Sequence, residues 1–327
     1  MTPLRIVAIG GGTGLSTLLH GLKNYAQEPR EIEITAVVTV TDDGGSSGRL
    51  RREFDVLPPG DIRNCMVALS EDEALLSKLF QYRFSEGRGL KGHSFGNLFV
   101  TALADITGDF AQAVKVSCEI LAIRGRIYPA TAGNVVLEAV LADGTVVRGE
   151  TKISKSRSRI DRIRLAPGGC KPLPETLAAI AEADLITFGP GSLFTSVIPN
   201  VLVDDIPIAI ERSPALKACF VNLMSQPGET TGFTASEHVN AIDSHAGMRL
   251  VDVVIVNDRP TTVSQRRKYA AEKARPVVND MTRLKEMDVE VVGADLLGEG
   301  PEVRHDPHRT ARIAVELARR ARVLAPI

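Results

Sequence analysis

The chain has 327 residues, of which 44% are hydrophobic, enough to bury the core of one large domain or of two closely packed lobes. A formal net charge of -1 gives no general attraction for nucleic acid or an anionic membrane, so partners have to be inferred from local sites. The four cysteines form no CxxC pair, which argues against a disulfide framework or a thiolate zinc site and fits a reducing cytoplasm.

A strand, a glycine turn and a helix open the chain. Residues 4–9 (LRIVAI) have the pattern of a buried strand, no signal-peptide pattern precedes them, and four leucines follow at helical spacing (Leu15, Leu18, Leu19 and Leu22). A second β-branched run, IEITAVVTV at 32–40, predicts the neighbouring parallel strand. No apolar run reaches the roughly 18 residues of a membrane span. We therefore expect a cytoplasmic protein with a βαβ opening.

Two helices and a hairpin follow in the middle of the chain. Ser70 and Glu73 have capping-box spacing, which predicts a helix that starts near residue 71 and buries an apolar stripe (Leu75, Leu76, Leu79 and Phe80). A further helix is expected over 95–103. Asp143-Gly144 stands between two alternating runs, which predicts a small antiparallel hairpin inserted into an α/β chain.

The C-terminal third repeats the pattern of strand, glycine turn and helix. DLITFGPGSLFTS at 184–196 has this order, and apolar runs at 217–224 and 250–257 predict two more strands. The helix between them has Thr234 and Glu237 in capping-box spacing, and a basic amphipathic segment closes the chain. Because no repeat or long linker interrupts the pattern, we expect a single domain over 1–327 with a mostly parallel sheet.

The first glycine turn, GGGTG at Gly10 to Gly14, predicts a phosphate site. Glycines let backbone amides approach a phosphate, and the N-terminus of the following helix adds a favourable dipole. The turn lacks the GK[ST] ending of a P-loop, and Leu15 stands where GxGxxG has its third glycine, which argues against a dinucleotide-dependent oxidoreductase. A tight turn without a ligand is the alternative interpretation.

Carboxylates follow the second strand. Asp42 and Asp43 stand where dinucleotide folds place an acid for the ribose hydroxyls, and a pair of carboxylates also suits Mg²⁺ beside a phosphate. PPGDIRN adds Asp61 as a further carboxylate and Arg63 as an anion partner. The alternatives are a solvated Asp-Gly turn and a helix cap.

Two later loops add donors. In FGPGS, Gly189, Gly191 and Ser192 offer amides and a hydroxyl, and they share a sheet edge with the first turn if the strands are parallel. The alternative is a simple Pro-Gly turn. GHSFGNL contains Asn97, but no Ser-His-Asp arrangement can be inferred from this loop. Two glycine turns on one edge suit an elongated nucleotide better than a bare phosphate.

These loops together resemble the YvcK family of bacterial proteins, also called gluconeogenesis factors. The resemblance rests on GGGTGLSTLLHGLK, TVTDDGGSSGRLR, PPGDIRN, GHSFGNL, PGSLFTSVIPNVLV and NLMSQPGETTGFTASEHV, and runs through RHDP at 304–307. The wider superfamily includes the 2-phospho-L-lactate transferases (CofD-like proteins), which hold Mg²⁺ next to a guanine nucleotide. The resemblance implies a Rossmann-like αβα sandwich.

The resemblance also implies roles for particular residues. It places Gly10, Gly11, Gly12, Thr13 and Gly14 against the pyrophosphate, and Asp42, Asp43 and Asp61 at acidic positions, with Asp43 and Asp61 as the candidate metal ligands. Asn97, Gly191, Ser192 and Asn222 fall in matching loops, and Tyr269 and Arg304 match positions associated with a UDP-sugar. From the residues alone, Tyr269 equally fits a core position and Arg304 a surface ion pair.

Two functions follow as hypotheses. The first is a cytoplasmic regulatory protein that binds UDP-N-acetylglucosamine and acts on cell shape and cell-wall synthesis during gluconeogenic growth, without a reaction of its own. The second is an Mg²⁺-dependent transferase of the phospho-lactate type, with a nucleotide diphosphate as the leaving group. As partners we expect the UDP-sugar or a related nucleotide, proteins of cell-wall synthesis and further copies of the chain, and neither nucleic acid nor a membrane.

Overall fold

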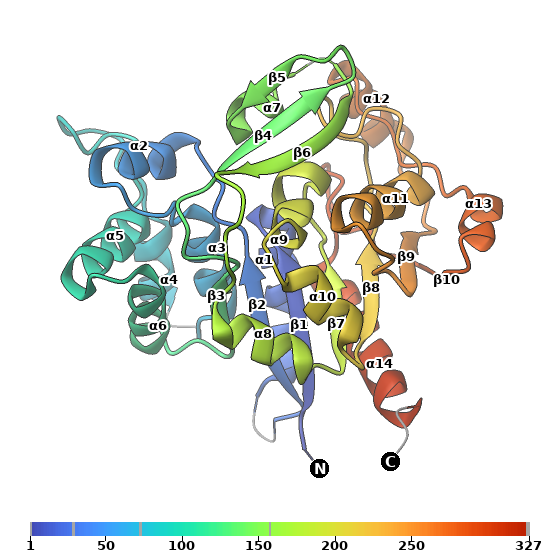
Figure 1. Cartoon of the computed structure of the whole chain (residues 1–327), viewed down its shortest axis with the longest axis horizontal. Coiled ribbons are helices and arrows are strands. Elements are labelled where there is room, and N and C mark those ends of the chain that lie inside the picture. The colour runs from blue at the N-terminus through green and yellow to red at the C-terminus, as the bar shows by residue number, and fades with distance from the viewer. Residues whose placement is uncertain (1, 28–29, 72–73, 157, 325–327) are drawn as a thin grey trace.

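The computed structural model describes residues 2–27, 30–71, 74–156 and 158–324. Its main feature is a parallel sheet of seven strands in the order β10-β9-β8-β7-β1-β2-β3, as Figure 1 shows. The strands are β1 (Leu4–Gly10), β2 (Ile32–Val38), β3 (Arg126–Pro129), β7 (Leu185–Phe188), β8 (Leu216–Phe220), β9 (Val253–Asn257) and β10 (Glu290–Ala294). The predicted parallel sheet is therefore confirmed, although the last two predicted strands are shorter than expected.

Helices cover both faces of this sheet, because alternate residues of its strands bury apolar side chains on opposite sides. Ile6 and Ala8 of β1 join a core formed with the first and last helices, whereas Val7 and Ile9 join a second core on the other face. On the first face, α1 (Gly12–Leu22) packs against α3 (Gly60–Leu69) and α14 (Pro307–Leu324). The four leucines predicted to face the core from α1 are all buried. The αβα sandwich is thus confirmed.

Short helices pack against the sheet in the second core, together with residues of the strands and loops. Ile180, Ile198, Ile210 and Ile242 reach it from four of these helices. These helices and the other short ones of the C-terminal half are α8 (Pro174–Ala181), η2 (Leu193–Val197), α9 (Ile198–Val201), α10 (Ile206–Arg212), α11 (Ala235–Ala246), α12 (Val263–Ala271) and α13 (Met281–Glu286). The predicted Thr234–Glu237 capping box is present at the start of α11. A 3-10 turn, η1 (Lys23–Tyr25), follows α1.

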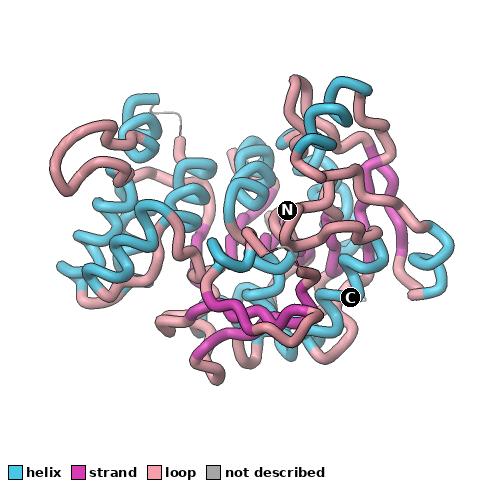
Figure 2. The backbone as a smooth tube through the Cα atoms, turned by 90° about the horizontal axis from the view of Figure 1, so that it is seen from above, coloured by secondary structure: helices cyan, strands magenta, loops and turns pink. Residues whose placement is uncertain are grey.

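A small antiparallel sheet lies over the carboxyl ends of the parallel strands, whereas both chain termini lie at the opposite end (Figure 1). Figure 2 shows the molecule from the side of this small sheet. Its strands are β4 (Val136–Leu141), β5 (Val146–Arg148) and β6 (Ile160–Ala166), in the order β5-β4-β6. The predicted Asp143-Gly144 turn joins β4 to β5, and the one-turn helix α7 (Glu150–Ile153) follows. The insertion therefore covers the edge of the sheet where the glycine turns lie.

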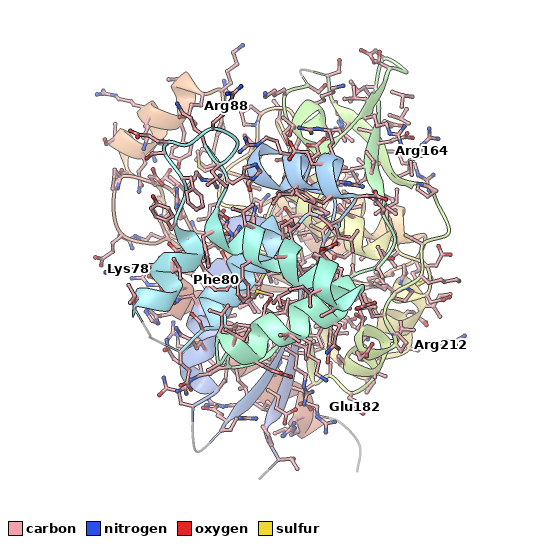
Figure 3. All side chains as sticks on the ribbon, turned by 90° about the vertical axis from the view of Figure 1, so that its left-hand side faces the viewer. Lys78, Phe80, Arg88, Arg164, Glu182 and Arg212 are labelled. Carbon is pink, nitrogen blue, oxygen red and sulfur yellow. The ribbon has the colours of Figure 1, made fainter. Side chains whose placement is uncertain are left out.

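A block of helices packs beside β2 and β3 and faces the viewer in Figure 3. It contains α2 (Gly45–Phe54), α4 (Ala74–Gln81), α5 (Phe95–Thr107) and α6 (Phe110–Ile120). Phe80, labelled in Figure 3, is buried against the rings of Phe95 and Phe99. Helix α5 confirms the predicted helix over 95–103, and the Ser94 side chain caps it.

The prediction for α4 was partly wrong. Glu71 is not helical, the described helix begins at Ala74, and Glu73 of the predicted capping box lies outside the described residues. Leu75 and Leu79 are exposed rather than buried, because α4 lies at the surface of the helical block and buries Phe80 as its anchor. The side chain of Leu76 is not among those that the structure describes. Ser70 instead ends α3 and its hydroxyl bonds to the Val67 carbonyl oxygen.

Candidate nucleotide site

A pocket of about 560 Å³ lies where β1, β7 and β8 end. It brings together most of the residues that the sequence predicts for a nucleotide: Gly11, Gly12, Thr13, Gly14, Gly191, Ser192, Asn222, Tyr269 and Arg304. Parallel strands place their carboxyl ends at one edge, so loops far apart in sequence converge there. We call this hollow the glycine-turn pocket.

The two glycine turns touch each other at Gly14. A Cβ added to Gly14 would lie 2.5 Å from the Pro190 carbonyl oxygen and 2.6 Å from the Gly191 Cα. A side chain of any size at this position would therefore separate the two turns. Gly12 has φ +62, a conformation that favours glycine, where the chain leaves β1 and begins α1. The turn thus presents backbone amides and a helix N-terminus to the pocket.

Asp61 supports the same turn from behind. A Cβ on Gly11 would lie 2.6 Å from the Asp61 Oδ2, so only glycine lets this carboxylate approach so closely. The Gly12 amide donates a hydrogen bond to Asp61. Burial, and then the charge of Asp42, raise the pKa of Asp61 to about 7, against the opposing effects of the Gly12 bond and Arg63. Asp61 lies next to the turn and outside the lining of the pocket.

Polar side chains of the FGPGS and QPGET segments line the far wall. Gln226 Nε2 donates to Ser192 Oγ at 2.8 Å, and Asn222 Nδ2 donates to Gln226 Oε1 at 3.2 Å. This chain of hydrogen bonds fixes the rotamers of all three side chains beside the glycine turns. Gln226 was absent from the predicted site, because in sequence it looks like an ordinary residue of a Pro-Gly loop.

The C-terminal segment closes the other end. The Tyr269 hydroxyl accepts a hydrogen bond from the Val303 amide at 3.0 Å, which holds the ring against the pocket. Arg304 extends into solvent and pairs with Glu302 at 2.5 Å. Its neighbour His305 also lines the pocket, and its Nε2 has no hydrogen-bond partner among the described residues. Burial lowers the pKa of His305 to about 4, so the imidazole is neutral at pH 7.

Several carboxylates gather between the first glycine turn and the antiparallel sheet. Burial, and then the charges of Asp61, Asp42, Glu229 and Asp43, raise the pKa of Glu150 to about 9. Its Oε2 has no hydrogen-bond partner among the described residues. Burial, reinforced by the neighbouring carboxylates, therefore favours the protonated forms of Asp61 and Glu150. We call these five residues, Asp42, Asp43, Asp61, Glu150 and Glu229, the acidic cluster.

Individual members of the acidic cluster also have structural bonds. Asp43 Oδ1 accepts from the Thr151 amide at 2.8 Å and from its hydroxyl at 2.6 Å, which ties α7 to the end of β2. Buried Glu229 accepts from Ser154 and Thr195, and burial raises its pKa. Glu229 lines the glycine-turn pocket, whereas Asp42 and Asp43 lie outside its lining. Sequence reasoning missed Glu150 and Glu229, since neither stands in a spacing pattern with the aspartates.

Three other predicted residues lie behind the site. Gly10 ends β1, and the Gly189 amide donates to the Ile9 carbonyl oxygen, so both shape the turns without lining the pocket. Asn97 is buried at the start of α5 and donates to Ser47 Oγ at 3.2 Å, on the Asp42 side of the acidic cluster. In the part of the chain that the structure describes, no group of three or more His, Cys, Asp and Glu side chains has metal-binding geometry.

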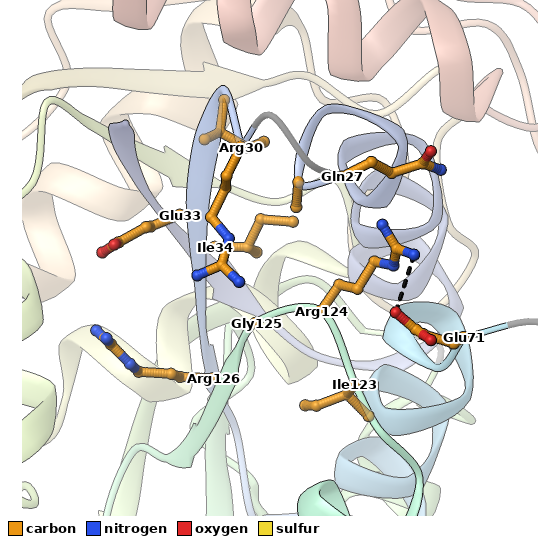
Figure 4. A pocket seen from close by; sticks show the side chains of 11 residues that line it. Gln27, Arg30, Glu33, Ile34, Glu71, Ile123, Arg124, Gly125 and Arg126 are labelled. Carbon is orange, nitrogen blue, oxygen red and sulfur yellow. Dashed lines mark ion pairs between the residues drawn. The ribbon is translucent and has the colours of Figure 1, made fainter. Parts of the chain in front are cut away.

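A different hollow of about 590 Å³ lies beside the first residues of β2 (Figure 4). Arg30, Arg124 and Arg126 line it, and Arg124 pairs with Glu71 at 2.9 Å. It lies at the opposite end of β2 from the acidic cluster and has neither of the glycine turns. It is therefore the weaker candidate for a nucleotide.

Known proteins similar to this chain share one family and one name. Residues 6–297 match the family model described as "2-phospho-L-lactate transferase CofD". The chain is 47% identical to the "Gluconeogenesis factor" of Bacillus subtilis over 96% of this chain and 98% of that protein. It is 50% identical to the "Putative gluconeogenesis factor" of Nostoc sp., covering 95% of this chain and 68% of that protein.

Solved structures show the same fold. A crystal structure of a protein from Bacillus halodurans superposes with a TM-score of 0.92 at 46% identity, covering 96% of this chain and all of that one. Among the described residues, no lone helix has the length and apolar character to cross a membrane, and one bent pair, Leu193–Val201 with Ile206–Arg212, meets the test by length and composition only.

Proposed function

The chain belongs to the CofD family, with relatives named gluconeogenesis factor over 96–97% of its length, and on this premise we propose that it is a nucleotide-sugar-binding regulatory protein. Its ligand in this proposal is a UDP-sugar, with UDP-N-acetylglucosamine as the first candidate. Its role is to support cell shape and cell-wall synthesis during growth on gluconeogenic carbon sources, in the cytoplasm.

The contact between Gly14 and Gly191 carries the proposal. It joins two glycine turns into one surface of backbone amides, at the N-terminus of α1, within a pocket of about 560 Å³. A diphosphate has two charged groups a few ångströms apart, so it suits two adjoining sets of amide donors better than one. The neighbouring Tyr269 ring and Arg304 guanidinium offer a stacking face and an anion partner for the rest of a nucleotide sugar.

The ionisable groups of the pocket favour binding over catalysis. The carboxylate of Glu229 accepts hydrogen bonds that hold Ser154 and Thr195, and His305 is a weak base because its pKa is lowered. A general base works best when its pKa is close to the ambient pH. These two lining residues therefore support a ligand that is held without being transformed, and Asp61, whose pKa is about 7, lies behind the turn and outside the lining.

The acidic cluster supports a second candidate, an Mg²⁺-dependent transferase. Carboxylate oxygens, among them the unpartnered Glu150 Oε2, are the ligands that a hard divalent cation prefers, although no three of the described side chains stand in metal-binding geometry. Asp61 and Asp43, with Asp42, would hold the ion, and bound Mg²⁺ would neutralise charge on a leaving diphosphate. The glycine turns would orient that diphosphate, and Asp61 would have to lose its proton before the ion binds.

A ligand screen tests the proposal. Purified full-length protein is titrated by calorimetry with UDP-N-acetylglucosamine, GDP and NAD, each with and without Mg²⁺, and the nucleotide is then analysed by mass spectrometry. The regulator should bind the UDP-sugar with a dissociation constant of about micromolar order and return it intact. Turnover that requires Mg²⁺ would favour the transferase, and absence of UDP-sugar binding would contradict the proposal.

A further inference from the structure

A second hollow adjoins the glycine-turn pocket on the other side of α1. It has a volume of about 610 Å³ and lies between α1, α3, α4 and the segment 304–307. Thr17, Arg304 and His305 line both hollows, so the two adjoin along these residues. Arg63, which the sequence suggested as an anion partner, lines only this second one. We call it the Arg63 pocket.

The lining of the Arg63 pocket carries one sign of charge. Arg63, Arg304, Lys23 and His20 contribute cationic or basic side chains, and the described residues that line it include no Asp or Glu. The glycine-turn pocket differs, because Glu229 and Glu272 are part of its lining. A concave surface with one sign of charge concentrates ligands of the opposite sign. The lining of the Arg63 pocket therefore favours an anion, which would compete with Glu302, outside the lining, for Arg304.

The Arg63 side chain is held in place and has hydrogen-bond donors that no described residue uses. Its aliphatic stem lies over Gly96, where an added Cβ would be 2.9 Å from both Cγ and Cδ. One terminal nitrogen, Nη2, donates to Asn64 Oδ1 at 2.6 Å, and Nε is buried without a partner among the described residues. Asp61 and Asp42 act on Arg63 through their charge, but no described carboxylate forms an ion pair with it. A buried donor without a partner costs free energy that a bound acceptor would recover.

Neutral donors and apolar atoms complete the pocket. Ser16, Thr17 and Ser77 supply hydroxyls, and Val67 and Ala68 supply an apolar floor. A guanidinium fork with nearby hydroxyls matches the tetrahedral oxygens of a phosphate group. The volume exceeds that of inorganic phosphate, so the apolar floor has room for an organic remainder.

We propose that the Arg63 pocket binds a second small ligand, a phosphate monoester, next to the nucleotide. Arg63 and Arg304 contact the phosphate, and Val67 and Ala68 contact the organic part. Because Arg304 lines both pockets, the second ligand lies beside the first. The proposal does not depend on which nucleotide the glycine-turn pocket takes.

Site-resolved NMR tests this proposal with glycerol 3-phosphate as the probe and glycerol as the uncharged control. The probe is titrated into nucleotide-free, ¹⁵N-labelled full-length protein. Its final concentration is about ten times a dissociation constant of millimolar order, so that a weak site is saturated. We expect saturable shifts of Arg63 Nε–H, Asn64 and Ser77 with the probe and none with glycerol. Shifts at Gly12 and Gly14 report binding in the glycine-turn pocket separately. Absence of binding in one pocket can therefore be distinguished from absence of binding in the other.

Two substitutions and a control complete the experiment. Arg63→Gln should weaken the binding followed at Asn64 and Ser77 by at least about tenfold, and Arg63→Lys, which keeps the charge but not the fork, by less. Arg52→Gln removes an equally charged, exposed residue of α2 and should leave the binding unchanged. Spectral dispersion checks that each variant is folded. Shifts confined to the glycine turn, or equal binding by wild type and both Arg63 variants, would overturn the proposal.

Discussion

Asp61 is the residue whose ionisation affects the site most directly, since it contacts the glycine turn and belongs to the acidic cluster. Its pKa is about 7 in the folded protein against an ordinary value of 3.8. The folded state therefore binds a proton more tightly than the unfolded state does between these pH values. Protonation of Asp61 therefore stabilises the folded state fully below about pH 4, and this contribution to the free energy of unfolding is lost as the pH rises through about 7.

We predict that Asp61→Asn removes this dependence. The amide cannot ionise, so the variant should not lose this stability as the pH rises from 5 to 8. The free energy of unfolding of the variant minus that of wild type should therefore be larger at pH 8 than at pH 5, by on the order of 2 kcal/mol. Urea denaturation of both proteins at the two pH values measures the difference. If the free energies of unfolding of variant and wild type differ by the same amount at pH 5 and pH 8, Asp61 has an ordinary pKa.

Gly14 allows a second prediction at the residue scale. Gly14→Ala places a methyl group within 2.6 Å of the Gly191 Cα, so the two turns must separate. We expect nucleotide affinity to fall at least tenfold and stability to fall by about 1–3 kcal/mol. Gly168→Ala is the matched control, because its added Cβ would find its nearest neighbour 3.9 Å away. Calorimetry and thermal unfolding compare the two, and an equally small effect of both would argue against the contact.

At the scale of elements, α7 and the antiparallel sheet are attached to the end of β2 through Asp43. Both hydrogen bonds to Asp43 Oδ1 come from Thr151, so they form one attachment of the insertion, beside the Ser154–Glu229 bond and the burial of Leu137 and Ile163 in the second core. This attachment gives Asp43 a role besides the metal-binding role predicted from the sequence. The two roles are separable, because Thr151 takes part in only one of them.

We predict that Thr151→Val loosens the insertion without changing the charge of the acidic cluster. Valine keeps the shape of threonine but loses the hydroxyl bond, so amide hydrogen exchange should rise in residues 149–153 while the sheet strands keep their protection. Mass-spectrometric exchange measures both regions. If Asp43→Asn has the same effect as Thr151→Val on exchange and on ligand binding, Asp43 acts as an anchor; a loss of Mg²⁺ binding confined to Asp43→Asn would identify it as a ligand.

Elements with strong local signals could be predicted from sequence. The leucine spacing of α1, the capping box of α11 and the Asp143-Gly144 turn depend on neighbours in the chain, and all three are present. Helix α4 was less predictable, because its burial depends on the surface position of the helical block and not on its own pattern.

For the whole molecule, the parallel sheet explains why loops that are distant in sequence form one site. Glycine turns have a recognisable composition, so Gly11 to Gly14 and Gly191 could be predicted. Glu150, Gln226, Glu229 and His305 could not, since their positions depend on how the insertion and the C-terminal segment fold over the sheet edge. Through-space contacts of this kind leave no spacing pattern in one sequence.

A crystal structure with UDP-N-acetylglucosamine bound is the most direct test of the account, whose central claim is that two adjoining glycine turns hold a nucleotide diphosphate. We predict that the diphosphate oxygens lie within hydrogen-bond distance of backbone amides of Gly11 to Gly14 and of the Gly191–Ser192 turn, with the rest of the ligand extending toward Tyr269 and Arg304. A diphosphate bound instead at the arginines beside β2, or an empty glycine-turn pocket at saturating ligand, would contradict it.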